Sequence, residues 1–288
     1  MVRRIGRDRF DLSRILIALL VLATVAGVFA LTPVRQATAD FLGLFRAKKM
    51  QTVQIDPAAM EEMAAQIRQQ VGSVDLAQFG QVEMVMKPEQ KQVPWSQAGS
   101  LVALPLRQPL DLPAGMTPVE PVTVFTGGHA SFTLKVDAVN QLLTSLGSKV
   151  LLPATLNNQP FAIAIPQGVQ RDYVLKEQRV TFSQFASPEI VAPPGTDVEA
   201  LRSSLLALPF LPPDLRQQLA AIDDWHNTMV VPYEASRMEK VQVNGEDAVF
   251  ARGDGGQQHL IWMEQGNLYQ LRGTISKEAM LQMARRLS

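Results

Sequence analysis

The chain contains no cysteine, which excludes disulfides, thiol catalysis and thiolate metal sites. It also lacks the glycine motifs that bind nucleotides, since neither G-x-G-x-x-G nor G-x-x-x-x-G-K-[ST] occurs. The G-x-S-x-G elbow of serine hydrolases is missing as well. We therefore expect no catalytic residue, no metal site and no cofactor, and the chain is predicted not to be an enzyme.

A basic face of the kind that binds nucleic acid is also lacking. Residues 1–49 carry nine Lys or Arg against three Asp or Glu, whereas residues 50–288 carry 18 against 24. The larger part of the chain is therefore mildly acidic, and phosphate backbones are bound by clustered cations. Nucleic acid is not an expected partner.

One apolar run organises the rest of the sequence. Residues 15–31 contain no charge and are flanked by Arg14 and Arg35. Apolar residues of this kind favour insertion into a bilayer by roughly 3–6 kcal/mol in total. A helix of this length is about 25 Å long, slightly less than the ~30 Å hydrocarbon core. The run predicts a transmembrane helix over residues 15–32 that contacts the lipid bilayer.

The distribution of arginine predicts the orientation of that helix. Five arginines precede it, whereas only Arg35 lies in the first ten residues beyond it. Positive residues stay on the cytoplasmic side, so residues 1–14 form a short cytoplasmic arm and residues 33–288 lie outside the cell membrane. The alternative is a cleaved secretory signal ending near Ala37-Thr38-Ala39. Both alternatives export the same domain.

Residues 33–90 are predicted to form a juxtamembrane helix and a connecting α/β segment. Apolar residues recur at helical spacing from 34 to 48, and the stripe includes Phe41, Leu44 and Phe45. This stripe is a candidate interaction surface, which packs on lipid headgroups, on the exported domain or on a protein partner. A strand at 50–55 and a helix from Pro57 to about residue 70 follow.

Residues 91–288 are predicted to form an extracytoplasmic α+β domain with an antiparallel β-sheet and packed helices. Seven prolines between 88 and 121 indicate extended, irregular chain. Two strand-like runs flank residues 126–129, and the glycine pair there predicts a hairpin. Asn244-Gly245 predicts a second hairpin, two further strands follow it, and Ser276 caps a last helix. Four antiparallel strands with one helix are typical of α+β structure.

The C-terminal residues resemble a known bacterial family. The resemblance rests on Val241-x-Val243-x-Gly245, Leu260-Ile261-Trp262 and Gly266-x-Leu268-Tyr269-x-Leu271. This pattern is similar to a domain of unknown function on the outer side of membrane-anchored anti-sigma factors and related envelope regulators. The resemblance implies a sensory or regulatory domain that contacts a protein partner in the bacterial cell envelope.

The sequence departs from that family at its N-terminus. A complete anti-sigma factor of this kind carries a cytoplasmic helical domain that grips the sigma factor, often through a His/Cys zinc motif. Here about 14 residues precede the predicted span, and they contain neither histidine nor cysteine. The alternatives are a stand-alone paralogue and a truncated gene start.

Two sets of side chains are candidates for chemistry or binding. Asp223-Asp224-Trp225-His226 contains groups that can bind a metal ion or transfer protons, but a turn with local capping is the favoured explanation. Three aromatic residues are candidate interaction residues that line a groove or fill the core of the sheet. They are Trp225, Trp262 and Tyr269.

These observations predict a non-enzymatic, single-pass membrane protein with an extracytoplasmic regulatory or sensory domain. The alternative from another functional class is an envelope carrier that binds lipid or lipoprotein in an apolar cavity of a curved sheet. An enzyme is the third possibility, and only the 223–226 cluster supports it. The identity of any small-molecule ligand does not follow from the sequence.

Overall fold

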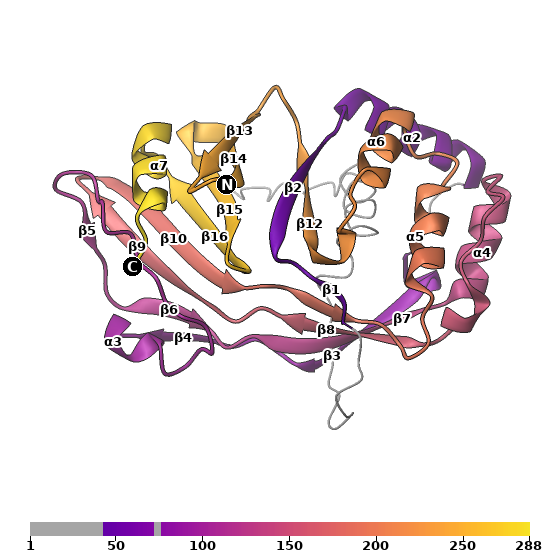
Figure 1. Cartoon of the computed structure of the whole chain (residues 1–288), viewed down its shortest axis with the longest axis horizontal. Coiled ribbons are helices and arrows are strands. Elements are labelled where there is room, and N and C mark those ends of the chain that lie inside the picture. Colours follow the sequence, from indigo (N-terminus) through magenta and orange to yellow (C-terminus); the bar gives the residue numbers. More distant parts are fainter. Residues whose placement is uncertain (1–42, 72–75) are drawn as a thin grey trace, which may run out of the picture.

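The structure, a computed structural model, describes residues 43–71 and 76–288. In this part of the chain the fold is α+β, with six α-helices and large antiparallel sheets (Figure 1). No helix among the described residues is both long enough and apolar enough to cross a membrane. The span predicted at 15–32 lies outside the described residues, as does Phe41.

Four consecutive stretches of chain each contribute a strand to both large sheets. The pairs are β3 (Gly80–Met86) with β4 (Gln90–Val93), β6 (Val122–Phe125) with β7 (Gly128–Leu134), β8 (Pro160–Ile165) with β9 (Gly168–Leu175), and β10 (Gln178–Ala186) with β11 (Glu189–Val191). The five-stranded sheet runs β1-β11-β8-β7-β3, and the nine-stranded sheet contains the matching order β10-β9-β6-β4. The two sheets are therefore halves of one long sheet that is bent along a shared line, which we call the crease.

Glycines allow neighbouring strands to pass one another at the crease. A Cβ on Gly128 would collide with the carbonyl oxygen of Met86, and one on Gly127 would lie 2.9 Å from the Ile165 oxygen. Gly127 also has a φ of +73°, which side chains rarely adopt. A Cβ on Gly168 would lie 2.5 Å from the Gln184 carbonyl oxygen. The crease therefore requires glycine where backbones approach most closely.

The predicted hairpin at residues 126–129 is wrong. Strand β6 pairs with β4 and β9, whereas β7 pairs with β3 and β8. The glycine pair carries the chain across the crease without reversing it. The Thr126 amide donates to the carbonyl oxygen of Glu89 at 3.1 Å, so hydrogen bonding to the neighbouring stretch continues at this point.

The predicted helix at residues 34–48 is also wrong where the structure describes it. Strand β1 (Gly43–Arg46) contains Leu44 and Phe45 and pairs antiparallel with β11, with Phe45 opposite Ile190. Phe45 is buried in the core between the sheet and the helices. Pairing with β11 satisfies backbone groups at the edge of the sheet, and this long-range partner outweighs the helical spacing of the sequence.

Helices gather at one end of the molecule, on the right in Figure 1. They are α2 (Pro57–Val71), α4 (Val136–Ser145), α5 (Val198–Leu206) and α6 (Pro213–Ala220). As predicted, α2 follows a strand, β2 (Lys49–Gln54), and buries Met60, Met63 and Ile67. Strand β2 pairs in parallel with β12 (Thr228–Tyr233) between the helices and the C-terminal strands.

The predicted C-terminal hairpins and helix are confirmed. The strands are β13 (Met238–Val243), β14 (Glu246–Arg252), β15 (Gln258–Glu264) and β16 (Asn267–Gly273), followed by α7 (Lys277–Arg285). Asn244 and Gly245 both have positive φ, as this tight turn requires. The Ser276 hydroxyl accepts a hydrogen bond from the Ala279 amide and caps α7. Pairing of β16 with β10 joins these strands to the long sheet.

The proline-rich segment is mostly extended and irregular, as predicted, and contains the short strand β5 (Thr117–Pro118). The short helix α3 (Trp95–Ala98) is the exception. The middle part of the segment lies against the C-terminus. The Gln108 amide donates to the Ser288 carbonyl at 2.9 Å, and the Ser288 amide donates back to Gln108 at 3.1 Å. Residues 105–111 therefore form a strap between the nine-stranded sheet and the end of the chain.

Replacing Gly168 by alanine is expected to lower the free energy of unfolding by about 1–3 kcal/mol, because the new Cβ overlaps the strand beside it. Urea denaturation of the full chain, followed by tryptophan fluorescence, measures this change. Gly99→Ala is the matched control, since its Cβ would meet nothing closer than 3.9 Å. Equal stability of the two variants would contradict the role of glycine at the crease.

Candidate functional site

The candidate site is an apolar cavity of about 80 Å³ between α5, α6 and β12. It is large enough for several methylene groups, since one water molecule needs only ~10–15 Å³ of such space. The residues that line it are Arg202, Leu205, Leu206, Leu208, Leu211, Leu219, Ile222, Trp225, Thr228 and Val230.

Two local sequence signals mark the starts of α5 and α6, the helices beside this cavity. The Asp197 carboxylate accepts a hydrogen bond from the Ala200 amide at 2.9 Å and caps α5. Pro213 occupies the first turn of α6, where its missing amide proton is not needed. The connection between the helices is short, so their leucines face one another across the cavity.

The lining differs between the floor and the rim. Leu211, Leu219, Ile222, Thr228 and Val230 are buried and form the floor. The other five lining residues are partly exposed and form the rim. A ligand with an apolar chain could therefore insert the chain toward the floor and leave a polar end at the rim.

Arg202 is the charged residue of the rim. Its Nη2 atom donates to the carbonyl oxygens of Ala220 at 3.0 Å and Ile222 at 2.9 Å. These carbonyls lie at the C-terminal end of α6, where helices leave acceptors unsatisfied. Arg202 thus closes the end of α6 and places a cation beside the apolar lining, with about 23% of its side chain exposed.

Trp225 forms another part of the rim. Its indole Nε1 donates to Glu199 Oε1 at 3.3 Å, and its ring stacks on His226 with centroids 4.1 Å apart. His226 Nε2 also lies 3.8 Å from Glu199 Oε1. The first turn of α5 therefore holds this tryptophan at the cavity, so one of the three predicted aromatic residues lies at the candidate site.

The 223–226 cluster adopts a turn in which Asp224 and His226 face different partners. Asp224 Oδ1 accepts from Asn227 at 2.8 Å, and its Oδ2 lies 3.7 Å from the Lys49 ammonium group. His226 faces Glu199 instead. In the described part of the chain, no three His, Cys, Asp or Glu residues are grouped so that they could hold a metal ion.

Trp262 and Tyr269 lie in the core of the nine-stranded sheet and are fully buried. Their rings stack with centroids 5.3 Å apart, beneath α7 and beside Phe182. Burial raises the pKa of the Tyr269 hydroxyl. Phe45 is buried as well, so these three candidate residues are not available as surface contacts in the folded domain.

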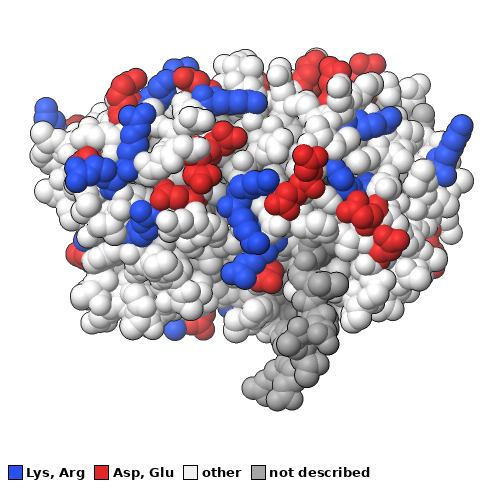
Figure 2. All heavy atoms as spheres, in the orientation of Figure 1, with Lys and Arg blue, Asp and Glu red and all other residues white. Residues whose placement is uncertain are grey.

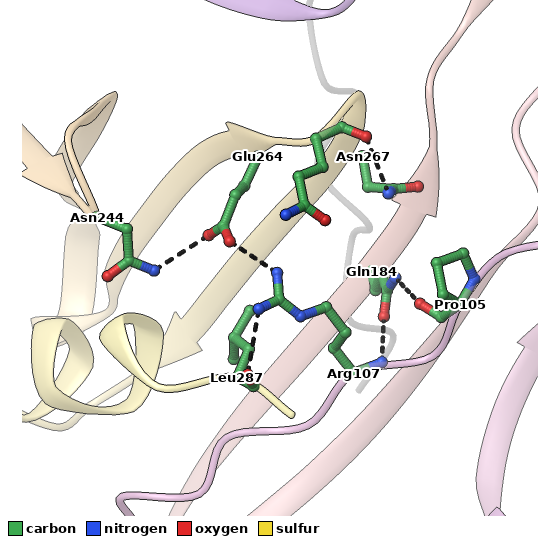
Figure 3. A network of polar contacts seen from close by, with 8 residues as sticks. Pro105, Arg107, Gln184, Asn244, Glu264, Asn267 and Leu287 are labelled. Carbon is green, nitrogen blue, oxygen red and sulfur yellow. Dashed lines mark hydrogen bonds and ion pairs between the residues drawn. The ribbon is translucent and has the colours of Figure 1, made fainter.

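A polar network around Arg107 was missed by the sequence analysis. Arg107 Nη1 donates to Glu264 Oε1 at 2.7 Å, and Nη2 donates to the Leu287 carbonyl at 3.1 Å (Figure 3). Gln184 contacts both Pro105 and the Arg107 amide, and Asn244 donates to Glu264. These bonds hold the strap on the sheet. An isolated arginine in a proline-rich apolar stretch was the only available signal.

Lys and Arg alternate with Asp and Glu on the face shown in Figure 2, and neither sign forms a continuous patch there. The cavity is apolar apart from Arg202 and Thr228. Its chemistry therefore favours apolar contact with a polar or anionic group at the rim, rather than polyanion binding.

Comparison with known proteins identifies one family. Residues 225–287 match the family described as "Domain of unknown function (DUF4367)". The match begins at Trp225, includes β12, the C-terminal strands and α7, and ends at Leu287. It covers less than a quarter of the chain. No curated protein matches the chain, and no solved structure matches it.

Arg202→Ala is expected to destabilise the protein by about 1–3 kcal/mol, because two carbonyls at the end of α6 lose their donor. Thermal unfolding monitored by circular dichroism measures this loss. Arg285→Ala provides the control, because Arg285 is exposed on α7 and a surface change of this kind stays within about 0.5 kcal/mol. If the Arg202→Ala variant is as stable as the unchanged chain, this arginine does not stabilise the end of α6.

Proposed function

We propose that this chain is a non-enzymatic, single-pass membrane protein whose extracytoplasmic domain senses a ligand with an apolar chain. The ligand occupies the cavity between α5 and α6. The observation that carries this proposal is the cavity itself, with its leucine lining and with Arg202 and Trp225 at its rim. The arginine bias before residues 15–31 supports the proposed location of this domain outside the membrane.

The volume of the cavity limits the ligand. Sites for drug-sized molecules usually measure roughly 300–1,000 Å³, whereas this cavity measures about 80 Å³. It can take one short alkyl chain or a single ring, but not the several acyl chains of a lipoprotein. This difference favours a sensor over the carrier that the sequence also allows. The polar end of the ligand would lie near the Arg202 guanidinium.

Strand β12 connects the cavity to the membrane-proximal part of the chain. Thr228 and Val230 line the cavity and lie opposite Lys49 and Gln51 of β2. The Lys48 amide also donates to the Asn227 carbonyl at 2.8 Å. Because β2 follows β1 directly, a shift of β12 on ligand binding would act on the chain that leads to the predicted span. We infer that this is how occupancy is passed to an envelope protein partner.

The DUF4367 match assigns no role to the chain, since that family is a domain of unknown function. The relationship to anti-sigma factors rests on the resemblance of the C-terminal pattern and is part of this proposal. We propose a partner on the outer face of the membrane or within it, because the cavity and β2 belong to the exported domain.

Short fatty acids of increasing length test the cavity. Affinity is expected to rise about fourfold for each methylene from butanoate to hexanoate, because each buried methylene contributes ~0.8 kcal/mol. Titration calorimetry of the full chain in nanodiscs, with empty nanodiscs subtracted, measures these affinities. Leu205→Phe should remove most of the gain, because the larger ring fills the space above the floor.

Leu110→Phe is the matched control, since Leu110 is exposed and lies outside the cavity lining. It should bind hexanoate as the unchanged chain does. The proposal fails if binding is not saturable, if affinity does not depend on chain length, or if both phenylalanine variants behave alike.

A further inference from the structure

Strand β3 forms an unusual edge of the five-stranded sheet. It is the last strand in the sheet order and pairs only with β7 among the described strands. Every residue from Gln81 to Met86 is exposed. The chain then enters β4, which is the last strand of the nine-stranded sheet and is also largely exposed. Residues 80–93 therefore form one edge that crosses the crease and that no further described strand pairs with.

The β3 part of this edge is much more apolar than an edge strand usually is. The described chain has eight exposed large apolar side chains, and four of them belong to β3. They are Val82, Met84, Val85 and Met86, with exposed fractions between 42% and 54%. Natural edge strands are usually protected by lysine, proline or covering chain. Strand β13, at the far end of the nine-stranded sheet, carries Lys240 and Glu239.

The sequence of the edge is complementary to itself. In an antiparallel pair of two copies centred on Val85, Met84 lies opposite Met86 of the other copy, and Glu83 lies opposite Lys87. Opposite charges and apolar pairs across strands both stabilise a sheet. Centring the pair on Glu83 would oppose two carboxylates, and centring it on Met86 would oppose Glu83 and Glu89. Of these three registers, the one centred on Val85 is the one that brings together apolar pairs and oppositely charged pairs.

We propose that β3 is a self-association surface that binds β3 of a second copy of this chain. The pairing is antiparallel about a two-fold axis at Val85 and joins the two five-stranded sheets into one. Both copies then use the same surface, which gives a closed dimer rather than a filament. The register between β3 and β7 shifts between Met84 and Met86, and the extra residue, Val85, is the one through which the proposed axis passes.

The absence of cysteine makes cross-linking a direct test. Across the axis, a cysteine at Val85 would meet its own copy within the ~4.4–6.8 Å between Cα atoms that a disulfide needs. Under mild oxidation, the full chain with Val85→Cys in nanodiscs or detergent should convert largely to a covalent dimer. Val82→Cys is the matched control, since it lies on the same strand but its two copies would be roughly 20 Å apart. It should stay monomeric on a denaturing gel.

Charge reversal tests the register by an independent measurement. Glu83→Lys and Lys87→Glu should each raise the dissociation constant of the dimer on the order of tenfold, because each creates like-charge pairs. The double variant should restore association, since it exchanges the two partners. Analytical ultracentrifugation of the full chain measures these constants. Recovery in the double variant separates a register effect from simple loss of folding.

Several outcomes would overturn the proposal. One is a chain that stays monomeric at every concentration, and another is equal cross-linking at positions 82 and 85. A third is a dimer that the charge variants do not change. A Val85→Cys chain that cross-links in cells only to a protein of different mass would show that a foreign strand occupies the edge. All of these readouts are independent of the proposed cavity ligand.

Discussion

The fold depends on the close approach of four stretches of chain at the crease. Each stretch leaves one half of the sheet and enters the other, so backbones must cross where side chains would not fit. Gly127, Gly128 and Gly168 remove the Cβ atoms that would collide with the neighbouring strand. Because both halves keep the same strand order, the bend preserves pairing on each side. Helix α4 packs on this bent sheet through Val136 and Leu143, and the strap is hydrogen-bonded to it through Gln184.

The matched family region does not form its core alone. Residues 225–287 contain β12 and the C-terminal strands, yet β12 pairs with β2 and β16 pairs with β10, both outside the match. The strap adds a third connection, since Arg107 binds Glu264 and the Leu287 carbonyl. The C-terminal unit is thus one end of a larger structure. Its Trp225, Thr228 and Val230 line the cavity together with seven residues that precede the match.

The features that the sequence predicted correctly have local causes. Asn244-Gly245 sets its own turn, Ser276 caps its own helix, and Met60 and Met63 follow the period of one helix. The features it missed depend on distant partners. Phe45 joins a strand because of Ile190, and the glycines at 127 and 128 serve a crease whose other strands lie up to about 60 residues away.

The candidate site shows the same limit. Trp225 was predicted from its type, but the leucines around it become a cavity only when α5, α6 and β12 meet. Trp262 and Tyr269 carry the same signal of a buried or binding aromatic residue, and the structure places them in the core. Aromatic type alone does not separate these environments, because the deciding factor is which sheet face and which helix cover the ring.

The proposed location of this cavity outside the cytoplasmic membrane is tested most directly by cysteine labelling in intact cells. Ser203 is exposed on α5 next to Arg202, and the chain has no other cysteine to react. We expect Ser203→Cys to react with a membrane-impermeant maleimide in intact cells, whereas Gly6→Cys should react only after lysis. Labelling of Gly6→Cys in intact cells, with Ser203→Cys protected until lysis, would contradict it.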